Sequence, residues 1–196
     1  MVKSISVNEK LHLVMPVFAD EGDSVVAYVH SAPVSREVIE AHFMLFARTF
    51  SLIYQKGLSI VGGTGSAHML LRMVAKDEDD EDGYVALMNE MRRLTNVMMR
   101  QPTGWEALPF QDVVDHKMLN EDDLSEVTNA IVFFTVLYAQ HRRRDRKVHL
   151  DGGLKLWTAQ ISSLDFTAYS ASLTTSTEKK PITVTQEPVA ESSQVF

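Results

Sequence analysis

The clearest pattern of apolar and polar positions lies between Asn120 and Arg146. Apolar side chains recur there at steps of three and four, the spacing of one face of an α-helix: Leu124, Val127, Ile131, Phe134 and Tyr138. From Ala130 to Ala139 the stretch is apolar on nearly every side, and such a helix is covered over most of its surface. The pattern therefore predicts a central helix, capped by Asn120, that is either the core of the domain or a surface held for another protein.

Two Val-rich stretches near the N-terminus, Lys10–Phe18 and Ser24–His30, are typical of β-strands. The five residues between them have the composition of a turn of hairpin length. Pro16 indicates an edge strand or a strand end, because proline cannot donate a backbone hydrogen bond. Since two strands alone are only marginally stable, we expect the hairpin, residues 10–30, to pack on helices or to pair with another chain.

Three further helices are predicted before the central one, over residues 35–57, 67–76 and 84–100. The first carries a stripe of large apolar side chains that we assign to the core: Ile39, Phe43, Phe46, Phe50 and Ile53. Ser66 is the expected N-cap of the second helix. The acidic run of residues 77–83 is expected to be a solvated loop, because like charges repel one another.

The remaining stretches complete the predicted organisation. Residues 105–110 are expected to be extended, residues 111–119 to form a short helix, and Gly152-Gly153 to break the chain. Residues 154–168 fit a helix or a strand equally well. From Ser170 onward, Ser, Thr, Glu, Pro and Lys predominate, which predicts a flexible low-complexity tail over residues 170–196. The expected fold is α+β and mainly helical, with about five helices, in a single globular domain over residues 1–169 whose helical body spans residues 34–169.

Composition narrows the classes of function. The chain has 196 residues, 45% of them hydrophobic, and a formal net charge of -7. An acidic chain is a poor match for duplex nucleic acid, whose phosphates require clustered Lys and Arg. With no cysteine, there is no disulfide, thiol nucleophile or Cys-ligated zinc site. No secretory signal and no membrane-spanning window are present, so we expect a cytoplasmic protein.

Motifs for chemistry are incomplete. The glycine stretch Gly62–Gly65 precedes a helix, as a phosphate-binding loop does, but it lacks the Lys-Ser/Thr pair and the third glycine of nucleotide-binding loops. If Gly83 is the sixth position of a calcium-binding loop, the twelfth is Asn89 instead of the required glutamate. The seven histidines are scattered. We therefore predict no catalytic, cofactor-binding or metal-binding residues.

Two features favour contacts with other proteins. The basic run Arg142–Lys147 fits either a contact with RNA or an acidic partner, or a helix C-terminus balanced by the helix dipole, and the acidic remainder of the chain favours the second. The chain also has ten methionines, several of them on two neighbouring predicted helices. Methionine fills cores, but it also forms adaptable apolar surfaces that hold several partners.

Five segments together resemble the tail assembly chaperones of long-tailed bacteriophages and prophages: KSISVNEKLHLVMPV, SVVAYVHSAPVSREV, MNEMRRLTNVMM, EDDLSEVTNAIVFFTV and LWTAQISSLDFTAYSASLTTST. The resemblance extends to about Thr177 and rests on overall pattern. It implies a small, mainly helical, non-enzymatic protein that binds the tape-measure protein, keeps it soluble and recruits tail-tube subunits. That family has no catalytic residues to transfer.

These features define the predicted function. We expect an assembly chaperone in the host cytoplasm, with a structural subunit of the virion as the alternative, and the sequence leaves open whether the chain forms a homo-oligomer. Neither membrane nor nucleic acid is an expected partner. The residues predicted to bind partners are Met88, Met91, Met98, Phe133, Val136, Leu137, Arg142, Arg143 and Arg144.

Overall fold

The structure is a computed structural model that describes residues 4–19, 24–56, 65–102 and 104–162. The chain divides into two units, Met1–Ser162 and Ser163–Phe196. The predicted tail, residues 170–196, and the glycines Gly62 and Gly63 lie outside the described residues. All the described residues belong to the first unit.

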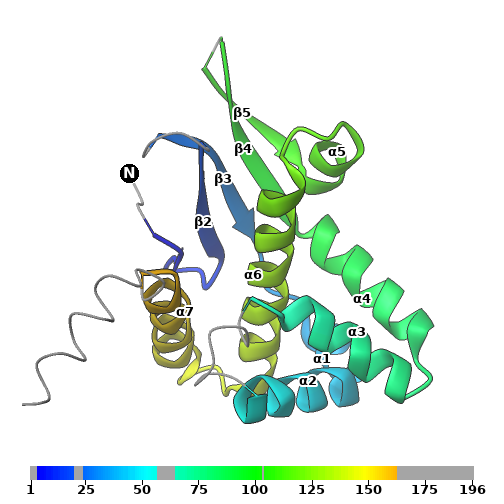
Figure 1. Cartoon of the computed structure of the whole chain (residues 1–196). Coiled ribbons are helices and arrows are strands. Elements are labelled where there is room, and N and C mark those ends of the chain that lie inside the picture. The colour runs from blue at the N-terminus through cyan, green and yellow to red at the C-terminus, as the bar shows by residue number, and fades with distance from the viewer. Residues whose placement is uncertain (1–3, 20–23, 57–64, 103, 163–196) are drawn as a thin grey trace, which may run out of the picture. The chain divides into compact units, whose positions relative to one another are not determined.

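Five strands and seven helices occur in the described part of the chain (Figure 1). The strands form one antiparallel sheet in the order β1-β2-β3-β4-β5. The α+β class is therefore confirmed, although the sheet is larger than the predicted hairpin. In chain order the elements are β1 (Ser6–Val7), β2 (Leu13–Phe18), β3 (Val25–Ser31), α1 (Arg36–Ala41), α2 (Phe43–Lys56), α3 (Ala67–Asp77), α4 (Glu81–Arg93), β4 (Thr95–Gln101), β5 (Gly104–Pro109), α5 (Phe110–Asp115), α6 (Glu121–Gln140) and α7 (Arg146–Ser162).

The N-terminal hairpin is confirmed as β2 and β3, in antiparallel pairing from Leu13↔Ser31 to Phe18↔Val25. Strand β1 pairs with β2 only at Leu13 and Val14. Among the described residues, the strand partner of Pro16 is Tyr28 of β3, on one side of β2 alone. The local environment of Pro16 is thus that of an edge strand, as a residue without a backbone N–H requires.

Residues 95–100 were assigned to a helix, and this prediction is wrong. Helix α4 ends at Arg93, and β4 follows with an alternating burial pattern in which Thr95, Val97 and Met99 are buried. Pairing with β3 and β5 on its two sides overrides the helical spacing of the methionines. The Thr95 hydroxyl donates to the Met91 carbonyl at 2.8 Å and lies 2.8 Å from the Ser31 hydroxyl across the strands, a contact that fits this register.

The helix predicted for residues 35–57 is interrupted at His42, which lies between α1 and α2 with φ -113° and ψ 27°. Ser35 caps α1 by accepting from the backbone N–H of Val38. The interruption changes the phase of the apolar stripe, so Phe43 is 55% exposed instead of buried. Phe46 and Ile53, farther along α2, are buried as predicted.

The central helix α6 lies in the middle of the helical layer and contacts α2, α3, α4, α7 and β2 (Figure 1). Asn120 caps it as predicted, because its side-chain oxygen accepts from the backbone N–H of Asp123 at 2.7 Å. Every residue from Asn129 to Leu137 is buried. Of the two interpretations of this stretch, the structure favours the core of the domain. The helix ends at Gln140, six residues before the predicted limit.

The predicted chain break at Gly152-Gly153 is also wrong, because both residues lie inside α7. A Cβ atom on Gly153 would come within 2.5 Å of Leu137 Cδ1 on α6. The glycine therefore allows α7 to approach α6 closely, which is a packing reason for its presence in a helix. Residues 154–162, which fitted a helix or a strand, are helical.

The loop within the acidic run of residues 77–83 is shorter than predicted. Asp77 is the last residue of α3, and Glu81 begins α4. The Asp80 carboxylate accepts from the backbone N–H of Gly83 at 3.0 Å, so it is the N-cap of α4. Glu81 and Asp82 then lie in the first helical turn, where negative charge is stabilised by the helix dipole.

Candidate functional site

The residues predicted to bind partners fall into three places. Five of them are in the core, with side chains at most 6% exposed: Met88, Met91, Phe133, Val136 and Leu137. Met98 is half-buried on β4. The arginines Arg142, Arg143 and Arg144 are exposed in the turn between α6 and α7. The five core residues fill the interior, so a surface for partners must be built from other side chains.

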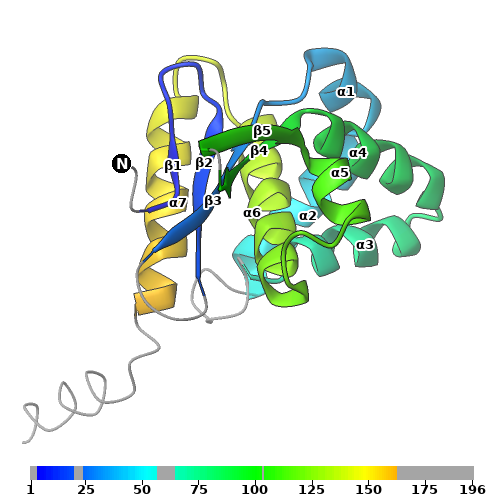
Figure 2. The same ribbon diagram turned by 90° about the horizontal axis from the view of Figure 1, so that it is seen from above.

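The sheet has two different faces, because side chains alternate along each strand. One face is buried and belongs to the hydrophobic core through Met15, Val29 and Val97, among others. Figure 2 shows α6 and α7 on the same side of the strands, and α6 contacts β2 while α7 contacts β1. The core is therefore a sheet covered by helices on this side.

The other face carries apolar side chains that are not part of the core cluster. In the register, Tyr28 of β3 lies opposite Pro16 of β2 and Met98 of β4, and Met98 lies opposite Ala107 of β5. Trp105 lies two positions along β5 from Ala107, and so points to the same face. We call Pro16, Tyr28, Met98, Trp105 and Ala107 the outer sheet face.

An aromatic contact organises the outer sheet face. The ring centroids of Tyr28 and Trp105 are 5.4 Å apart, so the tryptophan reaches across β4 to a residue two strands away. Trp105 is 39% exposed, and Met98, on the strand between β3 and β5, is half-buried. An exposed aromatic beside methionine is typical of protein interfaces, where aromatic residues and Met are enriched.

The Tyr28 hydroxyl oxygen is buried and has no hydrogen-bond partner in the described part of the chain. Leaving a buried hydroxyl unsatisfied costs about 1–3 kcal/mol.

The outer sheet face adjoins a free strand edge. Strand β5 is last in the sheet order, and no other strand of the described residues pairs with its far side. Five of its six residues are exposed, Leu108 being the exception. An exposed edge strand offers backbone hydrogen bonds to an added strand from another chain.

A second apolar area lies on the helices. Met69 is 72% exposed, and Met73 follows one turn later on the same face of α3. Phe43 and Met44 are exposed at the start of α2. The methionines thus include both core and surface residues: Met88 and Met91 fill the core, whereas Met69 and Met73 reach solvent.

The structure brings together histidines that are scattered in the sequence. His12 Nδ1 and His30 Nε2 are 3.2 Å apart, and the His141 and His149 rings stack with centroids 4.0 Å apart. Burial and the neighbouring His30 and Lys10 lower the pKa of His12. The first pair could have been found only from the strand register, which places Val14 opposite His30. No group of three or more His, Cys, Asp or Glu in the described ranges could hold a metal ion.

Among the described residues, no helix has both the length and the apolar character needed to cross a membrane. Comparisons of this chain with protein-family models, with curated proteins and with solved structures each found no match.

Proposed function

We propose that this protein is an assembly chaperone of a long-tailed phage or prophage, which acts by binding proteins and catalyses no reaction. In this proposal it holds the tape-measure protein in solution in the host cytoplasm and recruits tail-tube subunits. The resemblance of the five segments quoted above is what suggests this family, and the surface described next supports the proposal.

The outer sheet face is the observation that carries the proposal. An apolar area on the side of the sheet away from α6 and α7 is formed by Tyr28, Met98 and Trp105. Within this area, Trp105 remains 39% exposed. A long apolar helix of a client protein would cover these rings and the flexible methionine, which adapts to different side chains. Tyr and Trp supply much of the binding free energy of protein interfaces.

A co-expression pull-down with the tape-measure protein tests this proposal. We expect the wild-type chain to keep that protein soluble, and Trp105→Ala to release it with little change in thermal stability, because the ring is partly exposed. Met69→Ala, which removes an exposed methionine from α3, is the matched control and should retain the complex. Equal recovery of the tape-measure protein with and without the wild-type chain would contradict the proposal.

The free edge of β5 favours a second candidate, a structural subunit of the virion that joins its neighbours by strand addition. Mass spectrometry of purified particles separates the two candidates. A chaperone that is released is absent from the particle, whereas a tail or connector subunit is present in stoichiometric amount.

A further inference from the structure

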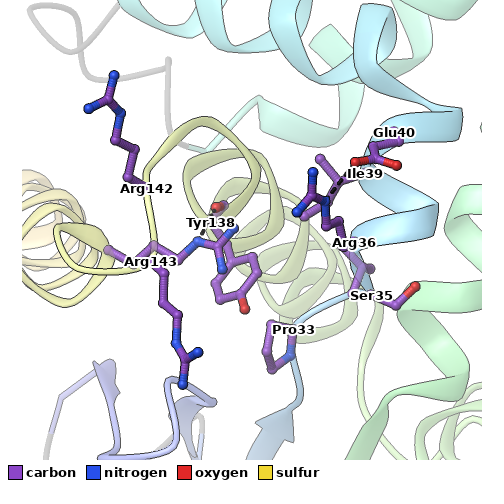
Figure 3. Close-up of a pocket in the computed structure, with 10 residues that line it drawn as sticks. Pro33, Ser35, Arg36, Ile39, Glu40, Tyr138, Arg142 and Arg143 are labelled. Carbon is purple, nitrogen blue, oxygen red and sulfur yellow. Dashed lines mark hydrogen bonds and ion pairs between the residues drawn. The ribbon is translucent and has the colours of Figure 1, made fainter.

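A basic pocket lies where the end of α6 and the α6–α7 turn face the start of α1 (Figure 3). Its volume is about 660 Å³, within the range of about 300–1,000 Å³ that is usual for ligand sites. The apolar parts of its wall are formed by Pro33, Val34, Ile39 and the Tyr138 ring. The charged lining groups are Arg36, Glu40, Arg142, Arg143 and Arg146.

The pocket is positive in a negative protein. Four guanidinium groups face one carboxylate there, whereas the whole chain has a net charge of -7. Arg36 pairs with Glu40 at 2.6 Å. Within the described residues, neither Arg142 nor Arg143 makes an ion pair or a side-chain hydrogen bond, so two cations are available to a ligand.

Arg146 and Tyr138 form the fixed part of this pocket. The Arg146 Nε donates to the backbone oxygens of Tyr138 and His141, at 3.1 and 2.9 Å, and so satisfies carbonyls at the end of α6. Its guanidinium carbon lies 4.0 Å from the centre of the Tyr138 ring. Because this arrangement is built into the fold, the positions of the two free arginines follow from the α6–α7 turn.

The directions of the arginines select the shape of the ligand. Figure 3 shows Arg142 and Arg143 pointing to opposite sides of the turn, with Arg36 across the pocket. In these directions, the two guanidinium groups are too far apart to share one compact anion. An extended chain with several carboxylates can contact them in sequence and place an apolar side chain against Pro33 and Tyr138.

We propose that this pocket binds an extended acidic segment of a partner protein, one that alternates carboxylates with apolar side chains. The inference rests on the proposed function only in taking the ligand to be a protein. It adds a second contact, separate from the outer sheet face, whose affinity falls as salt screens the exposed charges.

Fluorescence anisotropy tests the pocket without any phage protein. The probe is a labelled peptide of about eight residues that alternates Glu and Leu, at low ionic strength. We expect Arg143→Glu to weaken its binding about fivefold or more, since one exposed ion pair is lost and a repulsion replaces it. Arg72→Glu, on the exposed face of α3, changes the net charge by the same amount and should leave binding unchanged.

Other outcomes overturn the inference. If both variants weaken binding equally, attraction by the overall charge explains it, and the pocket is not the site. If pyrophosphate displaces the peptide at an equal concentration, the site takes small anions. If sedimentation shows wild-type self-association that Arg143→Glu removes, the occupant is a second copy. The double variant Arg142→Ala/Arg143→Ala repeats the test should the charge reversal impair folding, and Trp105→Ala should bind the peptide normally even if the proposed function fails.

Discussion

The side-chain oxygen of Asn129 accepts a hydrogen bond from the backbone N–H of His68, at 3.0 Å, and so joins α6 to the first turn of α3. The Asn129 amide nitrogen donates to the Ser125 carbonyl at 2.9 Å, so both ends of this buried side chain are used. Ser66, in the N-cap position of α3, makes no capping bond with its own side chain. A residue 61 positions away therefore satisfies one of the free N–H groups of the helix.

Replacing Asn129 by Ala should lower the free energy of unfolding by about 1–3 kcal/mol, because a buried backbone N–H loses its acceptor. Urea denaturation followed by circular dichroism measures this change. Ser66→Ala is the control, and it should change stability by less than about 0.5 kcal/mol, since no capping bond is removed. A larger loss in Ser66→Ala than in Asn129→Ala would refute this assignment of the cap.

Removal of the hydroxyl group should have different effects on stability at Tyr28 and at Tyr84, because the two hydroxyls lie in different environments. Tyr28→Phe removes a buried hydroxyl without a partner, so stability should stay equal or rise by up to about 1 kcal/mol. Tyr84→Phe removes a hydroxyl that lies 2.6 Å from His68 Nε2, so stability should fall by about 1 kcal/mol. Thermal denaturation of the two variants tests the pair, and destabilisation of both by the same amount would contradict it.

The adjacent glycines of α7 predict opposite signs for the same substitution. Gly152→Ala should raise the free energy of unfolding by about 0.5–1 kcal/mol, because nothing lies within 4 Å of the added Cβ and alanine favours the helix. Gly153→Ala should lower it by about 1–3 kcal/mol, because the methyl group meets Leu137 in the core. Similar effects of the two substitutions on urea denaturation would show that α7 does not pack on α6 as described.

Acid should destabilise the protein through His68. Burial lowers the pKa of this residue, and the positive charges of Arg92 and Arg72 lower it further. The folded state thus favours the neutral ring, so the stabilisation is complete above the ordinary pKa of 6.5 and is lost as the pH falls below that value. The wild-type protein should lose more stability between about pH 7.5 and pH 5 than His68→Gln does.

His12 should act in the same direction, because its pKa is also lowered. The double variant His12→Gln/His68→Gln should therefore show the smallest loss of stability over this range. If urea denaturation gives the double variant the same pH dependence as the wild-type protein, other groups control acid unfolding.

The helices and strands that depend on neighbouring residues could be predicted from the sequence. Asn120 as a cap and the apolar surface of α6 follow from neighbouring residues, as does the hairpin of β2 and β3. The error at β4 has a different cause, since Met98 fits the apolar stripe of the helix predicted over residues 84–100 and only the long-range pairing with β3 makes it part of a strand. The glycine at position 153 of α7 likewise depends on a residue of another helix, Leu137 of α6.

The candidate surfaces likewise combine features that the local sequence determines with features that only the fold determines. Met98 was named for its apolar character, but its position beside Tyr28 and Trp105 depends on the register of three strands. The exposed arginines were visible in the sequence as a basic run, whereas Arg36 joins them only through the fold. Composition therefore indicated the kinds of surface, and tertiary structure determined which residues form them.

The contact between α7 and β1 joins the first and last elements of the described unit (Figure 2). On the ribosome, the sheet emerges long before the helix that packs against its first strand. A nascent chain that ends at the α6–α7 turn has no α7 to pack against Leu137. Helix α6 therefore exposes apolar surface to other chains until α7 has been synthesised. Folding of this unit is thus completed late, and its unfinished form is the one most exposed to aggregation in the cell.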